Sequence, residues 1–174
     1  LEYGFRNYRD AVYWDRIEVG SDNYVFDTPQ TAYPDRMHAA GATMSLTVNN
    51  GHPAYDQGHT PTSPAAVNAF GRATGATVDR FAAITAVEIG NEFNSQPFVS
   101  GPLREKGLAE RAVAYSNLVR SVVINLNADD VRVIGGGVHS IPVSYLERVW
   151  DAGGFAGVHE LALHPYDTPW PQFR

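Results

Sequence analysis

Two glutamates stand four residues apart in the segment ITAVEIGNEFN, residues 84–94. Glu88 lies within an apolar run, and Glu92 follows that run directly after Asn91. Carboxyl groups are common general acids and bases, whereas a carboxylate buried within a sheet needs a partner. Because side chains alternate along a strand, a strand that continued to residue 92 would place both carboxylates on one side. The segment therefore predicts a buried strand that presents Glu92 at its end and holds Glu88 roughly 6–7 Å deeper.

The elements that must position these carboxylates alternate between strand patterns and helix patterns. Residues 4–14 are expected to form a short strand that runs into a polar loop, and further strands are expected at residues 42–48, 84–90, 131–137 and 158–166. The expected helices cover residues 31–41, 64–81, 107–127 and 142–154. Gly71 and Gly75 weaken the second of these helices, because glycine is a poor helix former. The alternation predicts parallel strands that are joined by right-handed crossovers.

A parallel sheet of this kind can close in two ways. We expect an α/β protein with a (β/α)8 TIM-barrel fold, seen as a partial barrel with about five βα units. An open doubly wound sheet is the alternative, and both folds place active sites at the carboxyl ends of the strands. The longer polar loops follow the strands, as both folds require. Arg9, at the end of the first expected strand, is the expected partner of Glu88.

Length and composition restrict the classes of protein that need to be considered. The 174 residues suit one domain, which we assign to residues 1–174. The net charge is −6 and there is no run of Lys or Arg, so we expect no nucleic-acid partner. No apolar run approaches the length of a membrane span, so we expect no membrane partner either. The absence of Cys leaves the compartment open, and our expectation is a secreted or periplasmic bacterial protein.

Histidines at the ends of expected strands raise the question of a metal site. His139 and His164 occupy such positions, and His52 and His59 flank the loop after residues 42–48. The sequence has neither a cysteine cluster nor two histidines at helical spacing, so we expect no metal and no other cofactor. Loop histidines more often lie at the surface or contact a substrate. His139 is therefore a candidate substrate contact.

Two other chemistries are disfavoured by their missing context. The run VIGGG follows a strand but lacks both the dinucleotide-binding glycine pattern and the P-loop lysine. Ser140 and Ser144 lack the surroundings of a nucleophilic serine. We therefore expect neither a nucleotide-binding protein nor a serine hydrolase.

Aromatic and polar loop residues are candidate contacts for a sugar. Four aromatic side chains could stack on sugar rings: Trp14, Tyr55, Trp150 and Trp170. Trp150 lies in the middle of an expected helix and is predicted to belong to the core. Trp170 lies in a Pro-flanked loop after the last strand and is the better candidate. Asn49 and His52 could bind hydroxyl groups, or could be turn residues only.

The motifs around Glu92 resemble those of the glycoside hydrolases of clan A, most closely the family 39-type retaining β-glycosidases. The fourth barrel strand of that clan ends in a pattern like W-E-x-G/W-N-E-P-N, and this chain has AVEIGNEFN. YRDAVYWDRIEVGSDNYVFDT is similar to the segment of their second strand, and LALHPY to their sixth. Phe93 replaces the usual Pro, and Ala86 and Val87 replace the aromatic residue that often begins the motif.

The resemblance implies a retaining glycosidase and assigns roles to individual residues. Glu92 would be the general acid/base, and Asn91 would hydrogen-bond a sugar hydroxyl. His164 and Tyr166 would line the sugar site, and Arg9 would support the catalytic carboxylates. The substrate would be a β-linked polysaccharide or oligosaccharide, and no cofactor is needed. A retaining mechanism also needs a second carboxylate, about 5 Å from the first, to attack the anomeric carbon.

That second carboxylate has no counterpart in this sequence. In clan A it comes from the end of the seventh strand, and by this count residues 1–174 cover strands two to six. Glu160 stands at the wrong end of the last strand, and Asp167 lies in a loop. A non-catalytic carbohydrate-binding or inactive barrel fragment is therefore an alternative, as is an open α/β protein that uses Glu92 differently. Open barrel edges also predict self-association.

Overall fold

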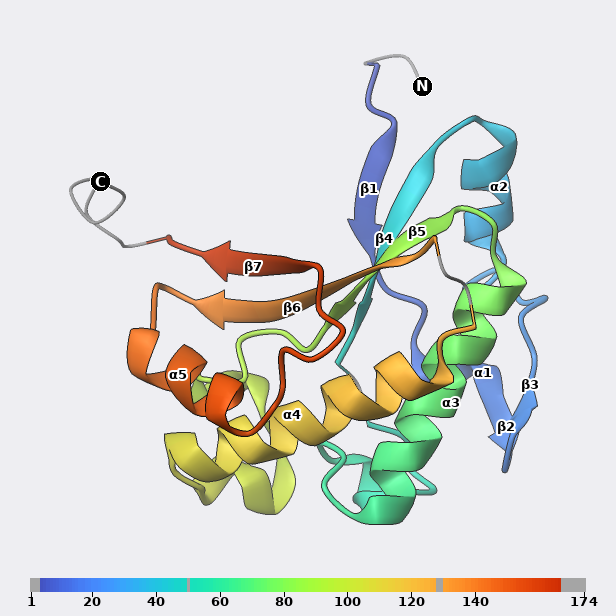
Figure 1. Cartoon of the computed structure of the whole chain (residues 1–174). Coiled ribbons are helices and arrows are strands. Elements are labelled where there is room, and N and C mark those ends of the chain that lie inside the picture. Colours follow the sequence, from blue (N-terminus) through green and yellow to red (C-terminus); the bar gives the residue numbers. More distant parts are fainter. Residues whose placement is uncertain (1–3, 50, 128–129, 167–174) are drawn as a thin grey trace.

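The computed structural model describes residues 4–49, 51–127 and 130–166. Its main feature is a curled parallel sheet of five strands (Figure 1). In sheet order these are β1 (Asn7–Asp10), β4 (Thr43–Val48), β5 (Ile84–Ile89), β6 (Arg132–His139) and β7 (Glu160–His164). Sheet order follows chain order, so each strand pairs with its neighbour in sequence. This curled half-barrel is consistent with the predicted partial TIM barrel and differs from a doubly wound sheet, in which the strand order reverses.

The two faces of the sheet differ in polarity. Met44, Leu46 and Val87 are fully buried on the face toward the helices. The register places Arg9 beside Ser45 and Thr47 beside Glu88 on the opposite, concave face. Alternation along each strand explains this division, because residues two apart share a face. The concave face is therefore the one that carries charged and hydroxyl side chains.

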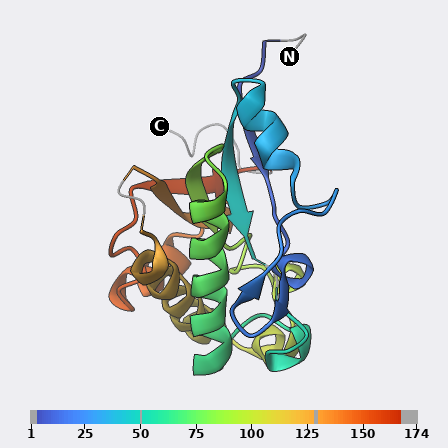
Figure 2. The ribbon, with the colours of Figure 1, turned by 90° about the vertical axis from the view of Figure 1, so that its right-hand side faces the viewer.

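Helices connect the strands and cover one side of the sheet. They are α2 (Tyr33–Ala39), α3 (Pro64–Arg80), α4 (Leu108–Asn125) and α5 (Val143–Asp151). Figures 1 and 2 show α3, α4 and α5 together on the same side of the curled sheet. Ser63 caps α3, because its hydroxyl oxygen accepts a hydrogen bond from the Ala66 amide at 3.2 Å. No helix in the described ranges is long and apolar enough to cross a membrane.

The expected short first strand is present as β1, but the segment after it contains a helix and a hairpin that were not predicted. Within residues 4–14, the strand is limited to β1. It is followed by the short helix α1 (Trp14–Ile17) and by a hairpin of β2 (Glu18–Gly20) and β3 (Asn23–Tyr24). A hairpin of this length shows no alternation in sequence. It is held instead by the buried Glu18 carboxylate, which accepts hydrogen bonds from the Trp14 indole, the Tyr55 hydroxyl and the Asp22 amide. Three 3₁₀ segments, at Asp56–Gly58, Gln96–Phe98 and Gly101–Glu105, were also not predicted.

The glycines of α3 allow this helix to approach α4 closely. A Cβ atom at Gly71 would overlap Ser121 Oγ and lie 2.5 Å from the Ser121 carbonyl oxygen. A Cβ atom at Gly75 would likewise overlap the carbonyl oxygen of Asn125. The close approach lets the Ser121 hydroxyl donate a hydrogen bond of 2.8 Å to the Val67 carbonyl. The two glycines therefore contribute to helix packing, although the sequence presents them only as poor helix formers.

We expect Gly71→Ala to lower the free energy of unfolding by about 1–3 kcal/mol, the usual cost of overpacking. The result should be destabilising even though Ala favours a helix over Gly by up to about 1 kcal/mol. Urea denaturation measures the effect. Asn68→Ala, at an exposed position of the same helix, is the control and should be neutral or slightly stabilising. A Gly71→Ala protein more stable than the wild type would contradict the close contact.

Candidate active site

Glu92 lies beyond the end of β5, in a turn of unusual backbone geometry. The strand ends at Ile89, and Gly90 and Glu92 both have positive φ, at 76° and 51°. The Glu92 amide donates to the Gly137 carbonyl of β6, and the Glu92 carbonyl accepts from the Ser95 amide at 2.7 Å. Strand alternation therefore does not extend to residue 92. The expected placement of both carboxylates on one side is still met, because His164 contacts Glu88 and Glu92. The side chain is nevertheless 96% buried, and it reaches the concave face through this turn.

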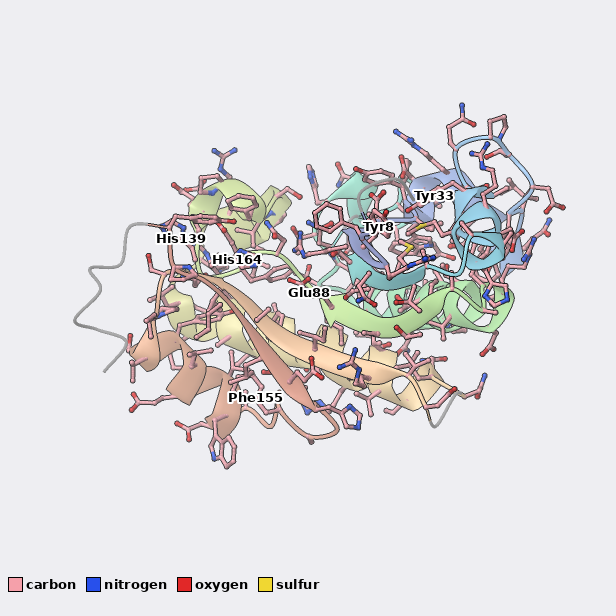
Figure 3. The ribbon with its side chains drawn as sticks, turned by 90° about the horizontal axis from the view of Figure 1, so that it is seen from above. Tyr8, Tyr33, Glu88, His139, Phe155 and His164 are labelled. Atoms are coloured by element: carbon pink, nitrogen blue, oxygen red, sulfur yellow. The ribbon has the colours of Figure 1, made fainter. Side chains whose placement is uncertain are left out.

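Two histidines flank the Glu92 carboxylate. His164 Nδ1 lies 2.8 Å from Glu92 Oε1, and His139 Nδ1 lies 3.5 Å from Glu92 Oε2. The histidines are register partners at the ends of β7 and β6, so the parallel pairing brings them together. Figure 3, seen from above, shows His139, His164 and Glu88 following one another across the site. The His164 side chain is mostly buried, whereas that of His139 is 41% exposed.

Glu88 is paired with Arg9, as the sequence predicts. Arg9 donates from Nε to Glu88 Oε2 and from Nη2 to Glu88 Oε1, the second at 2.9 Å. The hydrogen bond to Glu88 raises the pKa of the Arg9 guanidinium, so this side chain stays cationic. His164 Nε2 lies 3.7 Å from Glu88 Oε1. The imidazole of His164 therefore stands between the two buried carboxylates and contacts both.

The Arg9 guanidinium also orients Asn91. Its Nη2 donates to Asn91 Oδ1 at 3.2 Å. The amide oxygen is thus used within the site, and the NH₂ group is left to donate to a bound molecule. Arg9 and Asn91 are both partly exposed, so this side of the site is accessible to solvent. This arrangement involves only β1 and the turn after β5, and the sequence predicts that both lie at the carboxyl ends of the strands.

Tyr166 lies beside both histidines at the end of β7. Its ring centroid is 5.8 Å from that of His164 and 6.3 Å from that of His139. The side chain is exposed, so it forms a wall of the site that a ligand could contact. The structure therefore brings together six of the residues that the sequence singles out: Arg9, Asn91, Glu92, His139, His164 and Tyr166.

Two other candidates, His52 and Asn49, have surroundings of their own, and their contact with a sugar stays a prediction. His52 Nε2 lies 3.1 Å from the Glu18 carbonyl oxygen, and its ring packs against Trp14. Asn49 lines a small cavity with Trp14 and Phe70, between β4 and α3. Neither has a contact with Glu92 within the described ranges. Asn49 directly follows Val48, whose carbonyl accepts a hydrogen bond from the Gly90 amide at 2.8 Å, so it lies next to the β5 turn. His52 lies farther along the loop, against Glu18 of the β2–β3 hairpin.

The aromatic candidates divide differently from the prediction. Trp14 is buried and stacks on Tyr55, with ring centroids 5.2 Å apart, so it belongs to the core. Trp150, predicted to be core, is 72% exposed, and that prediction is wrong. Val149 and Tyr145 take the buried face of α5, and one further residue turns Trp150 about 100° away from it. Trp170 lies outside the described residues.

Asn94 is a site residue that sequence reasoning missed. Its side-chain amide donates to the His139 carbonyl and accepts from the His139 amide, each at 3.0 Å. The loop after Glu92 is thereby tied to the end of β6. An Asn two residues after Glu92 was visible in the sequence, but its partner 45 residues away was not. Among the described residues, no group of three or more His, Asp or Glu is arranged to hold a metal ion.

Comparison with solved structures finds proteins of similar fold. A family 39 glycoside hydrolase from the gut symbiont Bacteroides cellulosilyticus WH2 superposes with a TM-score of 0.68 at 17% sequence identity. The alignment covers 95% of this chain and 34% of that protein, so this chain spans about a third of its length. No family model matches the sequence, and no curated protein matches it either. The likeness shows a glycoside hydrolase-like barrel fold.

Proposed function

We propose that this chain carries the acid/base part of the active site of a retaining glycoside hydrolase that acts on a β-linked polysaccharide or oligosaccharide. The observation that carries the proposal is Glu92, a buried carboxyl group held against His164 at the carboxyl end of a barrel strand. Active sites of such barrels lie at this end of the strands. The family 39 hydrolase with the same fold supports the choice of reaction.

Each residue of the site has a part in this chemistry. Glu92 donates a proton to the leaving glycosidic oxygen and then removes one from the attacking water. Asn91 donates a hydrogen bond to a sugar hydroxyl from the amide nitrogen that Arg9 leaves free. His139 and Tyr166 contact the sugar from the exposed side. Arg9 and Glu88 act through the others, because their ion pair fixes Asn91 and His164.

The attacking carboxylate is the part that the described residues do not supply. Glu88 is joined to Glu92 through His164, but it is 97% buried and bound by Arg9 at both oxygens. A carboxylate held in this way cannot approach an anomeric carbon. We propose that the nucleophile is a Glu on a strand that follows β7 in a complete barrel.

The proposal is tested by incubating a chain that also includes the strand proposed to follow β7 with a panel of aryl β-glycosides and β-linked oligosaccharides. Release of aryl alcohol measures hydrolysis, and ¹H NMR of the first product gives its anomeric configuration. Hydrolysis with retention is the expected result for a site with its nucleophile. Inversion would refute the mechanism. Binding by calorimetry without hydrolysis would favour a carbohydrate-binding fragment, and neither binding nor hydrolysis would refute the proposal.

We also propose that the chain self-associates through its sheet edges. β1 and β7 are the edge strands of the described sheet, and Leu161 and Leu163 of β7 are 53% and 40% exposed. Exposed apolar edge strands favour pairing between molecules. Light scattering at increasing concentration should show dimers or larger species, and Leu163→Lys should reduce them. Ile124→Lys, at an exposed position of α4 away from the edges, is the control. A monomer at all concentrations would contradict this.

A further inference from the structure

Tyr115 places a buried hydroxyl group between two strands of the sheet. This side chain comes from the middle of α4 and is fully buried. Its hydroxyl donates to the Ile89 carbonyl of β5 at 3.0 Å and accepts from the Gly136 amide of β6 at 2.7 Å. Burial raises the pKa of the phenol well above its usual value, so the donor keeps its proton. A helix side chain thus joins β5 to β6.

The hydroxyl stands where the regular pairing of β5 and β6 stops. The last paired residues are Glu88 and Ile134. Beyond them Gly136 and Gly137 have positive φ, at 85° and 51°, and β6 bulges. The Gly137 carbonyl then accepts the hydrogen bond of the Glu92 amide. Tyr115 therefore holds the bulge on one side of Gly137, and the bulge holds the backbone of Glu92.

The ring of Tyr115 also shapes the turn before Glu92. A Cβ atom at Gly90 would lie 2.9 Å from Tyr115 Cε2 and 3.1 Å from Phe93 Cδ2. The rings of Phe93 and Tyr115 pack edge to face, with centroids 5.5 Å apart. Residues 90 and 93 are therefore packed against the same phenol that bonds Ile89 and Gly136.

We propose that Tyr115 is a positioning residue for Glu92: its hydroxyl takes the place of a main-chain bond between β5 and β6 and sets Glu92 against His139 and His164. The structural part of this proposal is independent of the proposed function. Its kinetic part rests on the proposed function, because a misplaced acid slows only a reaction that uses it.

The experiment compares Tyr115→Phe with Tyr145→Phe. Tyr145 is also fully buried in the helix layer, but its hydroxyl has no hydrogen-bond partner within the described part of the chain. Both variants lose one buried hydroxyl, and only the first loses bonds to the strands. Circular dichroism and a cooperative melt establish that each is folded. The readout is the set of imidazole ¹⁵N–¹H correlations of His139 and His164, assigned with His139→Gln and His164→Gln.

Tyr115→Phe is expected to shift the imidazole resonances of both histidines, and Tyr145→Phe to leave them in place. Unchanged resonances in a folded Tyr115→Phe protein would overturn the proposal. A second measurement uses the wild-type protein and therefore does not depend on whether a variant folds. The wild-type Gly136 amide should exchange with solvent as slowly as the paired amides of β6, and fast exchange would overturn the proposal.

A kinetic measurement separates this proposal from the proposed function. If the protein hydrolyses aryl β-glycosides, Tyr115→Phe should lower kcat about ten- to a hundredfold, with KM nearly unchanged. Tyr145→Phe should keep the wild-type kcat. An unchanged kcat in Tyr115→Phe would overturn the positioning role. These rates are measured on a chain that includes the strand proposed to follow β7, because the described residues do not supply the nucleophile. If that chain is inactive, the glycosidase proposal fails while the histidine resonances still decide the role of Tyr115.

Discussion

In a chain that includes the strand proposed to follow β7, replacement of Glu92 by Gln is expected to lower kcat/KM for aryl β-glycosides about 10²–10⁴-fold, the usual contribution of a general acid or base. Gln has the shape of Glu and can keep a hydrogen bond to His164, but it cannot donate a proton to a leaving oxygen. The substitution is therefore expected to leave the fold intact, so the lower kcat/KM measures the loss of proton transfer. Initial rates over a range of substrate concentrations measure the effect.

The leaving group distinguishes an acid from a merely structural carboxylate. A dinitrophenolate departs without protonation, so the loss should be much smaller for dinitrophenyl glycosides than for alkyl or sugar leaving groups. Glu147→Gln, at an exposed position of α5, is the matched control and should keep the wild-type rate. An equal loss for every leaving group would exclude the role of Glu92 as a proton donor.

Replacement of Arg9 by Met is expected to lower the free energy of unfolding by about 2–3 kcal/mol. The variant leaves Glu88 as a buried carboxylate without its cation, and breaking a buried pair usually costs about 3–5 kcal/mol. The expected value is lower because Arg9 is half exposed and water screens part of the interaction. Urea denaturation at neutral pH measures the change.

A double-mutant cycle separates the ion pair from the other contacts of Arg9. Glu88→Gln removes the buried charge, so adding Arg9→Met to it should cost clearly less than Arg9→Met alone. The Arg132–Glu160 pair is the control, because it lies on the same sheet with side chains 58% and 43% exposed. Arg132→Met should cost less than about 1 kcal/mol. Additive effects at Arg9 and Glu88 would show that the pair is not coupled.

The Arg9–Glu88 ion pair is an interaction that local sequence patterns were sufficient to predict. A buried charge on an apolar strand needs a partner of opposite charge. The predicted strands carry few such residues, so the pairing of Arg9 with Glu88 could be predicted from the sequence. The turn at Gly90 could not be predicted from such patterns. Its geometry depends on Tyr115 of α4 and on β6, which are distant in the chain, as well as on the nearby Phe93. For the same reason the strand pattern was wrongly extended to Glu92.

Other differences have the same origin. Gly71 is a poor helix former in isolation, and only the presence of Ser121 on α4 shows why a larger residue does not fit. Trp150 is apolar and lies in a helix, yet Val149 and Tyr145 take the buried face. Residue type indicates whether burial is favourable, but the neighbouring elements decide whether space exists.

The sequence by itself determined the alternation of strands and helices, the parallel sheet, the polar ends of its strands and the carboxylate that stands at one of them. The spacing of apolar residues over short stretches of the chain indicates which segments form strands and which form helices. Only the tertiary structure decided that His139 and His164 flank Glu92 and that Asn94 and Tyr115 tie its loop to β6. These contacts join residues far apart in sequence, and the sheet register sets them.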